Sequence, residues 1–294
     1  MASGAGFAID QGMRRASRVT DSVQEIAEIE VEAMPGVTIL VHECKKPRGD
    51  WSSAQLIDFH GLVLVRRGGF KLRLDGQDEF IGPSMAFFEG LGAEYQIQHP
   101  NDDGDTTTMV KFTEDAAVRL TGDADFPTRP LITEGWIDFE HRRLIADLHR
   151  GIDGFEAEET VARLVGVLIE AAAPGRVTTK RSSTEYRHRR IVDLVREAVA
   201  VDPVNSSLAR VASLAGRSIF HVSRTFRRHT GMRLSRYRNS VRTSVALQRI
   251  EEGETDLAGL ATRLGFTDQA HMTRVIRTEI GVTPARIRKM LTNR

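Results

Sequence analysis

Two similar blocks lie about fifty residues apart near the C-terminal end of this chain, at residues 207–231 and 256–284. Each block predicts a short helix that contains alanine, a turn that contains glycine, and a longer helix with arginine on its outward face. A glycine follows each longer helix, Gly231 or Gly281, and glycine at this position favours helix termination. The blocks therefore predict two helix-turn-helix units, whose second helices suit the major groove of DNA.

Charge is divided unevenly along the chain. The 294 residues carry 41 basic and 40 acidic side chains, a net charge of +1. Residues 181–294 carry 22 basic side chains against 10 acidic ones, whereas residues 1–180 carry 19 against 30. In the basic part, Lys289 is the only lysine. Because arginine makes bidentate contacts with phosphate and guanine, this part is suited to a polyanionic partner such as DNA.

The sequence also indicates a cellular compartment. The single cysteine, Cys44, excludes an intramolecular disulfide and fits a reducing environment. The first residues lack the apolar segment of a signal peptide, and no stretch approaches the ~20 apolar residues that span a bilayer. We expect a soluble, cytoplasmic protein that does not contact a membrane.

The first half of the chain predicts β-strands followed by helices. Residues 36–112 alternate apolar and polar side chains in short runs separated by turn signals, which predicts an antiparallel barrel or sandwich. Helical spacing follows at 137–150 and 155–173. The second of these helices carries an apolar stripe that either packs in the core or pairs two protomers: Val161, Leu164, Val165 and Leu168.

The C-terminal part has helical spacing throughout and predicts about seven helices, so the expected fold class is α+β with more than one domain. Residues 233–250 form a longer helix that bridges the two helix-turn-helix units. The expected helix caps are Ser206 or Ser207, Asp256, and Thr267 or Asp268, with Gly216 in the first turn.

Each of the two longer helices has an apolar and a polar face. Ile219, Val222 and Phe226 of the first helix are spaced to face the core, as are Met272 and Ile276 of the second. The opposite faces carry groups that match base edges or phosphates: Phe220, Ser223, Arg224 and Arg227 in the first helix, and Gln269, Ala270, Thr273, Arg274 and Arg277 in the second, with His271 near the boundary.

Over residues 186–290 these features resemble the AraC/XylS family of bacterial transcription regulators. The matching residues of the first unit are Ala212, Ser218, Arg224, Phe226 and Gly231. Those of the bridging helix are Tyr237, Arg242 and Ala246. Those of the second unit are Ala261, Gly265, Phe266, Arg274, Gly281, Pro284 and Arg288. The chain departs from the family pattern at core or near-core positions: Thr243, Met272, Val275 and Ile276.

The resemblance implies a bipartite domain whose third and sixth helices enter adjacent major grooves of double-stranded promoter DNA. It implies base-reading roles for Phe220, Ser223, Arg224, Gln269, Ala270, His271, Thr273 and Arg274. Phosphate contacts are expected from helix N-termini and from Arg217, Ser218, Arg227, Arg228 and Arg277. RNA polymerase is a further expected partner.

The N-terminal strands resemble the cupin-type domain that many members of the family carry, through residues 65–70, Phe87, Phe88 and 93–105. Such a domain binds a small effector inside its barrel and pairs protomers through its helices, which implies a homodimer. The sequence assigns no residue to the effector. The expected parts are a flexible extension at 1–20, a cupin-like sensing and dimerisation domain at 21–173, a linker at 174–184 and the DNA-binding domain at 185–294.

Histidines and the cysteine permit a second interpretation of the N-terminal part. His42, His60 and His99 include no H-x-H pair, so we expect no metal, no cofactor and no catalytic residue. His42 and Cys44 share one face of a predicted strand, which permits a soft-metal or thiol sensor, although a buried inert thiol is the commoner outcome.

An acidic turn gives a further alternative. Asp102, Asp103 and Asp105 around Gly104 resemble a cation-binding loop, but a solvated turn between strands is the commoner outcome.

The function that the sequence favours is sequence-specific DNA-binding regulation of transcription, controlled by an effector at the N-terminal barrel. The alternative is a cupin-like enzyme or ligand-binding protein whose basic C-terminal domain binds a partner other than DNA. A third interpretation is an architectural DNA-binding protein without an effector.

Overall fold

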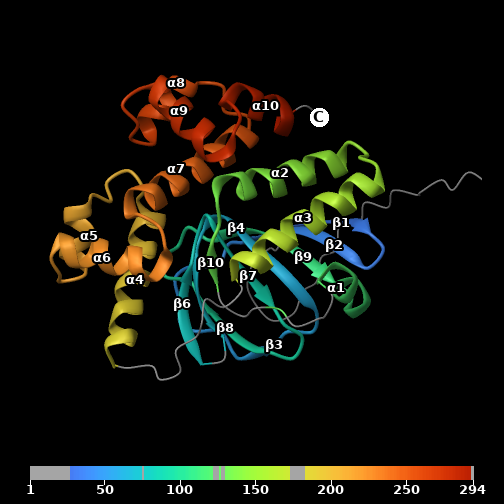
Figure 1. The fold of residues 1–294 in the computed structure, drawn as a ribbon, viewed down its shortest axis with the longest axis horizontal. Helices are drawn as coiled ribbons and strands as arrows, with labels where there is room; N and C mark the ends of the chain where they lie inside the picture. Colours follow the sequence, from blue (N-terminus) through green and yellow to red (C-terminus); the bar gives the residue numbers. More distant parts are fainter. Residues whose placement is uncertain (1–26, 75, 122–125, 127–129, 173–182, 293–294) are drawn as a thin grey trace, which may run out of the picture.

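The computed structural model describes residues 27–74, 76–121, 126, 130–172 and 183–292. Two antiparallel sheets face each other in the N-terminal part (Figure 1). The first sheet has six strands in the order β1 (Ala27–Met34), β2 (Val37–Cys44), β9 (Asp105–Phe112), β4 (His60–Gly68), β7 (Met85–Glu89) and β10 (Leu131–Ile132). The second sheet has four strands in the order β3 (Gln55–Leu56), β8 (Glu94–Gln98), β5 (Phe70–Leu74) and β6 (Gln77–Ile81).

The predicted antiparallel β-domain is confirmed, but its sheets do not close into a barrel. Every pairing between the described strands lies within one sheet or the other. The chain passes between the sheets at Gly68, which has a φ of 70° and whose Cβ, if present, would lie 1.9 Å from the carbonyl oxygen of Gly104. Only glycine fits this bend. The bend turns the chain away from the six-stranded sheet, so the two sheets stack as an open sandwich.

Strand β4 is buried on both faces because it lies between two apolar clusters. Val63 and Val65 point between the two sheets, where they pack with residues of β5, β6 and β7. Leu62 and Leu64 point to the opposite side of the six-stranded sheet, which the helices α2 (Gly135–His149) and α3 (Gly154–Ala172) cover (Figure 1). Burial on both faces explains why this strand reads as a nearly continuous apolar run.

The apolar stripe of α3 faces the sheet. Val161, Leu164, Val165 and Leu168 are at most 4% exposed and belong to the cluster between this helix, α2 and the six-stranded sheet. They are core residues, so the alternative that they form a dimer seam is wrong. The domain also contains β1 and the short helix α1 (Glu114–Thr121), which the sequence pattern did not predict.

Seven helices make up the described C-terminal part, as predicted. They are α4 (Ser183–Val201), α5 (Leu208–Leu214), α6 (Ile219–Thr230), α7 (Leu234–Glu251), α8 (Leu257–Arg263), α9 (Gln269–Ile280) and α10 (Pro284–Thr292). Two apolar clusters hold them, one around α4 to α6 and one around α8 to α10. The bridging helix α7 supplies Tyr237 and Val241 to the first cluster and Leu247 and Ile250 to the second.

The predicted extension at 1–20 and nearly all of the predicted linker at 174–184 lie outside the described residues. The domain boundaries therefore stay predictions. None of the described helices is both long and apolar enough to cross a membrane.

Candidate nucleic-acid interface

The first helix-turn-helix unit consists of α5, a turn and α6. The side chains of Ser207 and Ser218 cap the two helices, because each accepts a hydrogen bond from the backbone N–H three residues later, at 3.1 and 3.2 Å. The turn contains Gly216 with a φ of 58°, and α6 ends at Gly231 with a φ of 72°. The sequence-predicted frame of this unit is confirmed, with Ser207 and not Ser206 as the first cap.

Helix α6 buries a narrower stripe than the sequence predicts. Val222 and Phe226 are fully buried, as expected, but Ile219 is 47% exposed, so its predicted core position is wrong. Ile219 is the first residue of α6, whereas the buried residues lie on the following turns. The outward positions are exposed at Phe220, Arg224, Arg227 and Arg228 and half-buried at Ser223.

The second unit consists of α8, a turn and α9, and it repeats this frame. Asp256 caps α8 and Asp268 caps α9, each by accepting a backbone N–H at 2.8 and 2.7 Å. Gly265 in the turn has a φ of 69°, and Gly281 after α9 has a φ of 92°. The structure selects Asp268 over Thr267 as the cap of α9.

Helix α9 has the two faces that the sequence predicts. Met272 and Ile276 are fully buried. The outward positions are exposed at Gln269, Ala270, Arg274 and Arg277, and Thr273 is half-buried.

His271 lies at the boundary of α9 and contacts its own unit. Its ring packs edge-on against Phe266, with ring centroids 5.5 Å apart, and its Nδ1 lies 3.2 Å from the hydroxyl of Thr267. These contacts hold the imidazole against the turn before α9. Among the predicted base-reading residues, His271 is thus the one whose ring already has partners within the fold.

Arg242 of α7 connects the two units. Its guanidinium donates to the carbonyl oxygens of Pro203 and Val204, at 3.0 and 3.3 Å, in the loop that precedes the first unit. The same group lies 5.4 Å from the ring centroid of Phe266 in the second unit. Burial, together with the nearby Arg238, lowers the pKa of Arg242 to about 10. This residue therefore fixes the relative placement of the two units.

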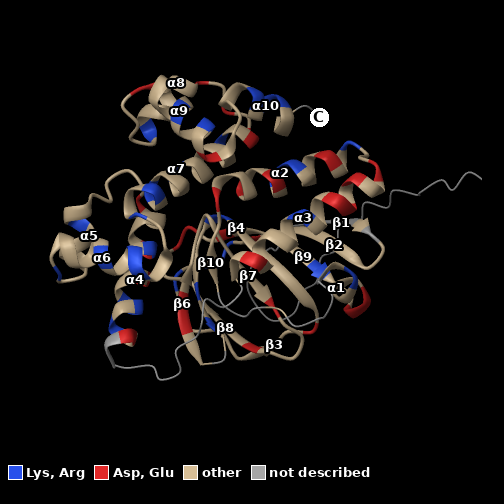
Figure 2. Cartoon of the chain, viewed as in Figure 1, with Lys and Arg blue, Asp and Glu red and all other residues tan. Residues whose placement is uncertain are grey.

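Basic residues lie along α4, α6 and α9 (Figure 2). Six exposed arginines flank or lie on the two longer helices: Arg217, Arg224, Arg227, Arg228, Arg274 and Arg277. Within the described part of the chain, none of the six forms an ion pair, whereas other exposed arginines such as Arg249 and Arg263 are paired with glutamate. Unpaired guanidinium groups on two capped helices form a surface that can bind a polyanion.

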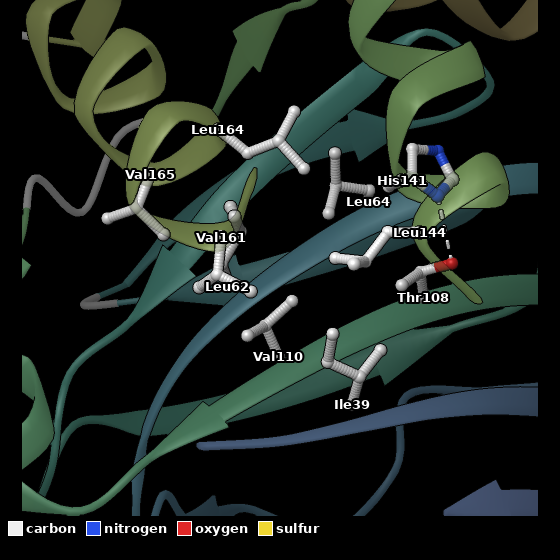
Figure 3. A pocket seen from close by; sticks show the side chains of 10 residues that line it. All are labelled: Ile39, Leu62, Leu64, Thr108, Val110, His141, Leu144, Val161, Leu164 and Val165. Carbon is white, nitrogen blue, oxygen red and sulfur yellow. Dashed lines mark hydrogen bonds between the residues drawn. The ribbon is translucent and has the colours of Figure 1, made fainter. Parts of the chain in front are cut away.

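A small pocket lies between the six-stranded sheet and the helices α2 and α3 (Figure 3). Its lining is apolar except for Thr108 and His141, and comprises Ile39, Leu62, Leu64, Thr108, Val110, His141, Leu144, Val161, Leu164 and Val165. His141 Nδ1 lies 3.1 Å from Thr108 Oγ1. The family resemblance implies that an effector binds between the two sheets. Apolar side chains fill that space, and the pocket lies on the other side of the six-stranded sheet.

Buried polar groups connect this pocket to the bridging helix. His141 Nε2 and Arg142 Nε both lie 3.1 Å from Asp138 Oδ1, and all three residues are on α2. The other side of the Arg142 guanidinium donates to Gln248 and Glu251 of α7, both at 2.8 Å. No pattern along the sequence predicted this cluster.

The titration behaviour of this cluster follows from its burial. Burial lowers the pKa of His141 to about 4, so the imidazole is neutral at pH 7. Burial alone would raise the pKa of Asp138, but Arg142 and His141 hold it well below its usual range. The Asp138 carboxylate and the Arg142 guanidinium are therefore a buried ion pair.

Comparison with known proteins places the C-terminal part among DNA-binding domains. Residues 211–290 match the family model of a helix-turn-helix domain. The multiple antibiotic resistance protein MarA of Escherichia coli strain K12 is 32% identical over 82 residues, which are 28% of this chain and 65% of MarA. The chain thus spans slightly less than two thirds of this relative.

Two further similarities cover more of the chain. The transcriptional activator RhaS of Escherichia fergusonii is 23% identical over 243 residues, which are 79% of this chain and 86% of RhaS. The crystal structure of fatty-acid-bound ToxT from Vibrio cholerae is 15% identical with a TM-score of 0.34, and the match covers 90% of this chain and 99% of ToxT.

Proposed function

We propose that this chain, whose C-terminal residues form an AraC-type helix-turn-helix domain, is a sequence-specific DNA-binding regulator of transcription. The match of residues 211–290 to a helix-turn-helix domain supports the resemblance to the AraC/XylS family that the sequence predicts. MarA and RhaS, which match this part, are by name a resistance protein and a transcriptional activator. The proposal assigns no catalytic role to the chain.

The observation that carries the proposal is that one long helix, α7, joins the two capped helices α6 and α9. Helices α6 and α9 both present exposed, unpaired arginines, and α7 contributes to the apolar core of both units. Two major-groove contacts on one face of DNA are separated by ~34 Å, so one protomer should cover roughly 17–20 base pairs. Because the two helices carry different side chains, the two half-sequences should differ.

Base reading is assigned to the outward faces of the two helices. Arg224 and Arg274 are the strongest candidates, since both are exposed and arginine pairs bidentately with guanine. Phe220, Ser223, Gln269, Ala270, Thr273 and His271 complete the proposed base-reading set. The proposed phosphate contacts are Arg217, Ser218, Arg227, Arg228 and Arg277.

Control by a small apolar effector is proposed for the pocket under α2 and α3, whose cavity volume of about 10 Å³ has room for no more than about one water molecule, so that a ligand must push the lining side chains apart. His141 lines this pocket and contacts Asp138. Asp138 pairs with Arg142. The Arg142 guanidinium also donates to Gln248 and Glu251 of α7. A ligand that displaces His141 would alter the contacts that fix the bridging helix, and with it the placement of both DNA-reading helices.

The proposal includes a cytoplasmic homodimer that contacts RNA polymerase at the promoter. Since the apolar stripe of α3 is in the core, the dimer contact must use other residues. Phe155, at the start of α3, is 76% exposed and is one apolar side chain available for it.

Arg224→Ala and Arg274→Ala test the assignment. The DNA is a cognate site selected from genomic fragments by the full-length protein. Each substitution should weaken binding by about 1–3 kcal/mol and relax base preference in one half of the site. Arg249→Ala is the matched control, because Arg249 is exposed on α7 and paired with Glu252. Unchanged affinity and base preference in both variants would refute the recognition assignment.

A salt series separates the proposal from its alternative. Counterion release makes the logarithm of the DNA affinity fall linearly with the logarithm of salt concentration. A folded full-length protein that shows no affinity for any duplex DNA would favour the ligand-binding or enzymatic alternative. If no small molecule changed the DNA affinity of the full-length protein, an architectural role would be favoured.

A further inference from the structure

Three side chains that could ligate a metal meet at one end of the sandwich. Cys44 is the last residue of β2, His99 follows β8, and Asp105 is the first residue of β9. All three are buried, and their ligand atoms lie within 4.8 Å of one another. His99 Nε2 lies 3.5 Å from Cys44 Sγ and 2.8 Å from Asp105 Oδ2. None of these residues takes part in the DNA-binding surface or in the pocket.

Nε2 of His99 faces both Cys44 Sγ and Asp105 Oδ2 and has one hydrogen or one lone pair to share between them. A ring nitrogen either donates one hydrogen or accepts one. If Nε2 of His99 donates to Asp105, the Cys44 thiol loses it as an acceptor; if Nε2 accepts from the thiol, its lone pair faces a carboxylate. A cation at the centre would accept a lone pair from each of the three atoms at once.

The arrangement differs from a catalytic cysteine, histidine and aspartate relay. In such a relay the nucleophile and the carboxylate contact opposite nitrogens of the imidazole. The carboxylate orients the ring, and the nucleophile gives its proton to the other nitrogen. Here Cys44 and Asp105 both contact Nε2 of His99. The geometry therefore favours ligation over nucleophilic catalysis.

The backbone around the three side chains is fixed by close contacts. Gly104, which precedes Asp105, has a φ of 64°, and a Cβ there would lie 2.2 Å from the carbonyl oxygen of Cys44. Gly68 on the neighbouring strand β4 would place a Cβ 2.8 Å from the Cα of Asp105. Both approaches require glycine, and they hold Cys44 and Asp105 at adjacent positions of paired strands.

Of the three aspartates in the acidic turn, only Asp105 points inward. Asp102 and Asp103 are exposed, and Asp102 accepts the backbone N–H of Arg48 at 2.8 Å. The solvated-turn interpretation thus holds for these two, and the carboxylates do not converge into a cation loop. The inward turn of Asp105 supplies the third group of the buried cluster.

A second imidazole lies near the thiol. His42 lies two residues before Cys44 on the same face of β2 and is only partly buried.

We propose that Cys44, His99 and Asp105 bind a divalent transition-metal ion, with Zn²⁺ as the best fit. One thiolate, one imidazole and one carboxylate are all donors that zinc accepts. Calcium and magnesium require oxygen ligands, which excludes them from a site with sulfur and nitrogen. From the sequence we expect no metal, because the histidines contain no H-x-H pair, and the one soft-metal alternative is His42 with Cys44.

Metal binding there would join the two sheets. Cys44 and Asp105 belong to the six-stranded sheet, whereas His99 directly follows β8 of the four-stranded sheet. The ion would thus cross-link the open sandwich at one end and raise its stability by linkage.

Cobalt titration of the full-length protein after chelator treatment tests the site. Cobalt bound by a thiolate gives a charge-transfer band in the near ultraviolet. Since Cys44 is the only cysteine of the chain, such a band identifies this site alone. We expect about one equivalent of Co²⁺ to give the band and Zn²⁺ to abolish it. Co²⁺ binding without the band, or no binding, would overturn the proposal.

Variants separate this site from a second group of potential ligands, Glu185, His188 and His229. Cys44→Ser should lose the band, and Asp105→Asn should weaken binding at least about tenfold. Asp103→Asn and His229→Ala are the matched controls and should keep the band and the affinity. Full affinity in Asp105→Asn would remove the carboxylate from the site.

A measurement on the unmodified protein covers the case in which a variant does not fold. Zn²⁺ should slow alkylation of Cys44 by a thiol reagent and raise the melting temperature of the chelator-treated protein. An alkylation rate that does not respond to Zn²⁺ would contradict the proposal independently of any substitution.

Discussion

The two helix-turn-helix units share one internal design but attach to the N-terminal part differently. Both have side-chain caps on each helix and a left-handed glycine after the longer one. The second unit packs directly on α2, which contributes Phe139 to its apolar cluster. The first unit packs on α4, and α4 in turn contacts β6 of the four-stranded sheet. The N-terminal part thus packs against α9 itself in the second unit, and in the first unit it packs mainly against α4, which lies beside α6.

Each attachment contains a buried arginine. Arg142 joins α2 to Gln248 and Glu251 of α7 and is fully buried. Arg196 of α4 contacts Glu79 of β6 at 2.6 Å and is also buried. A signal from the pocket therefore has a short path to the bridging helix and the second unit. We expect disturbances under α2 to affect the second unit more than the first.

The largest expected effect is that of Arg142→Ala. The substitution leaves the Asp138 carboxylate buried without its cation and Glu251 with one partner fewer, which should lower the free energy of unfolding by about 3–5 kcal/mol. Arg196→Ala should have a smaller effect, because the side chain of its partner Glu79 is 31% exposed. Urea denaturation of the full-length variants measures both. Equal losses would refute the asymmetry of the two attachments.

The next effect is the pH dependence that His141 produces. The pKa of His141 is about 4 in the folded chain and 6.5 when unperturbed. As the pH falls from 6.5 to 4, the imidazole therefore binds a proton in the unfolded chain but stays neutral in the folded chain. This removes at most about 3 kcal/mol of stability between pH 6.5 and 4.

The contribution of His141 is isolated by difference, because burial raises the pKa of Glu89 and of Asp193 to about 7 and acts in the opposite direction. The stability advantage of the natural chain over His141→Gln should shrink as the pH falls from 6.5 to 4. His229→Gln, at the first unit, should show a smaller change, since His229 is less buried. Parallel stability curves for the natural chain and His141→Gln would contradict the assigned pKa.

Substitution of the helix caps should affect the DNA affinity of the two units differently, because one cap is neutral and the other is charged. Ser218→Ala and Asp268→Ala each remove one cap and should each lower stability by about 1 kcal/mol. Their effects on DNA affinity should differ. Ser218→Ala removes a proposed phosphate contact and should weaken binding, whereas Asp268→Ala removes a negative charge from the N-terminal end of α9, which is proposed to face DNA. Thermal unfolding and binding titrations distinguish these outcomes, and equal losses of affinity would contradict the proposed contact.

The smallest effect is expected at the rim of the second attachment. Arg236 of α7 lies 3.6 Å from Glu134 and 3.7 Å from Glu279 of α9, and its side chain is 51% exposed. The Glu134 pair is exposed on both sides, whereas the Glu279 side chain is only 9% exposed. Arg236→Ala should lower the free energy of unfolding by about 1 kcal/mol or less, because Arg236 itself is half exposed and solvent screens its charge. A loss above that of Arg196→Ala would show that this rim holds α9 more firmly than its geometry indicates.

Local sequence signals predicted much of the C-terminal part. The caps Ser207, Asp256 and Asp268 follow from their position before helical spacing, and their hydrogen bonds depend only on neighbouring residues. Ile219 was misplaced because period alone does not show where a helix starts to contact its neighbours. The strand β1 and helix α1 were missed, and the sheets do not close as a barrel.

The sequence by itself determined the two helix-turn-helix frames and the concentration of arginine around them, because both depend on spacing along one helix. Tertiary structure alone decided which distant residues meet. It brought Arg142 to Glu251 and placed Cys44, His99 and Asp105 around one nitrogen atom. The physical reason is that burial and pairing of polar groups depend on packing between segments far apart in the chain, which no local period encodes.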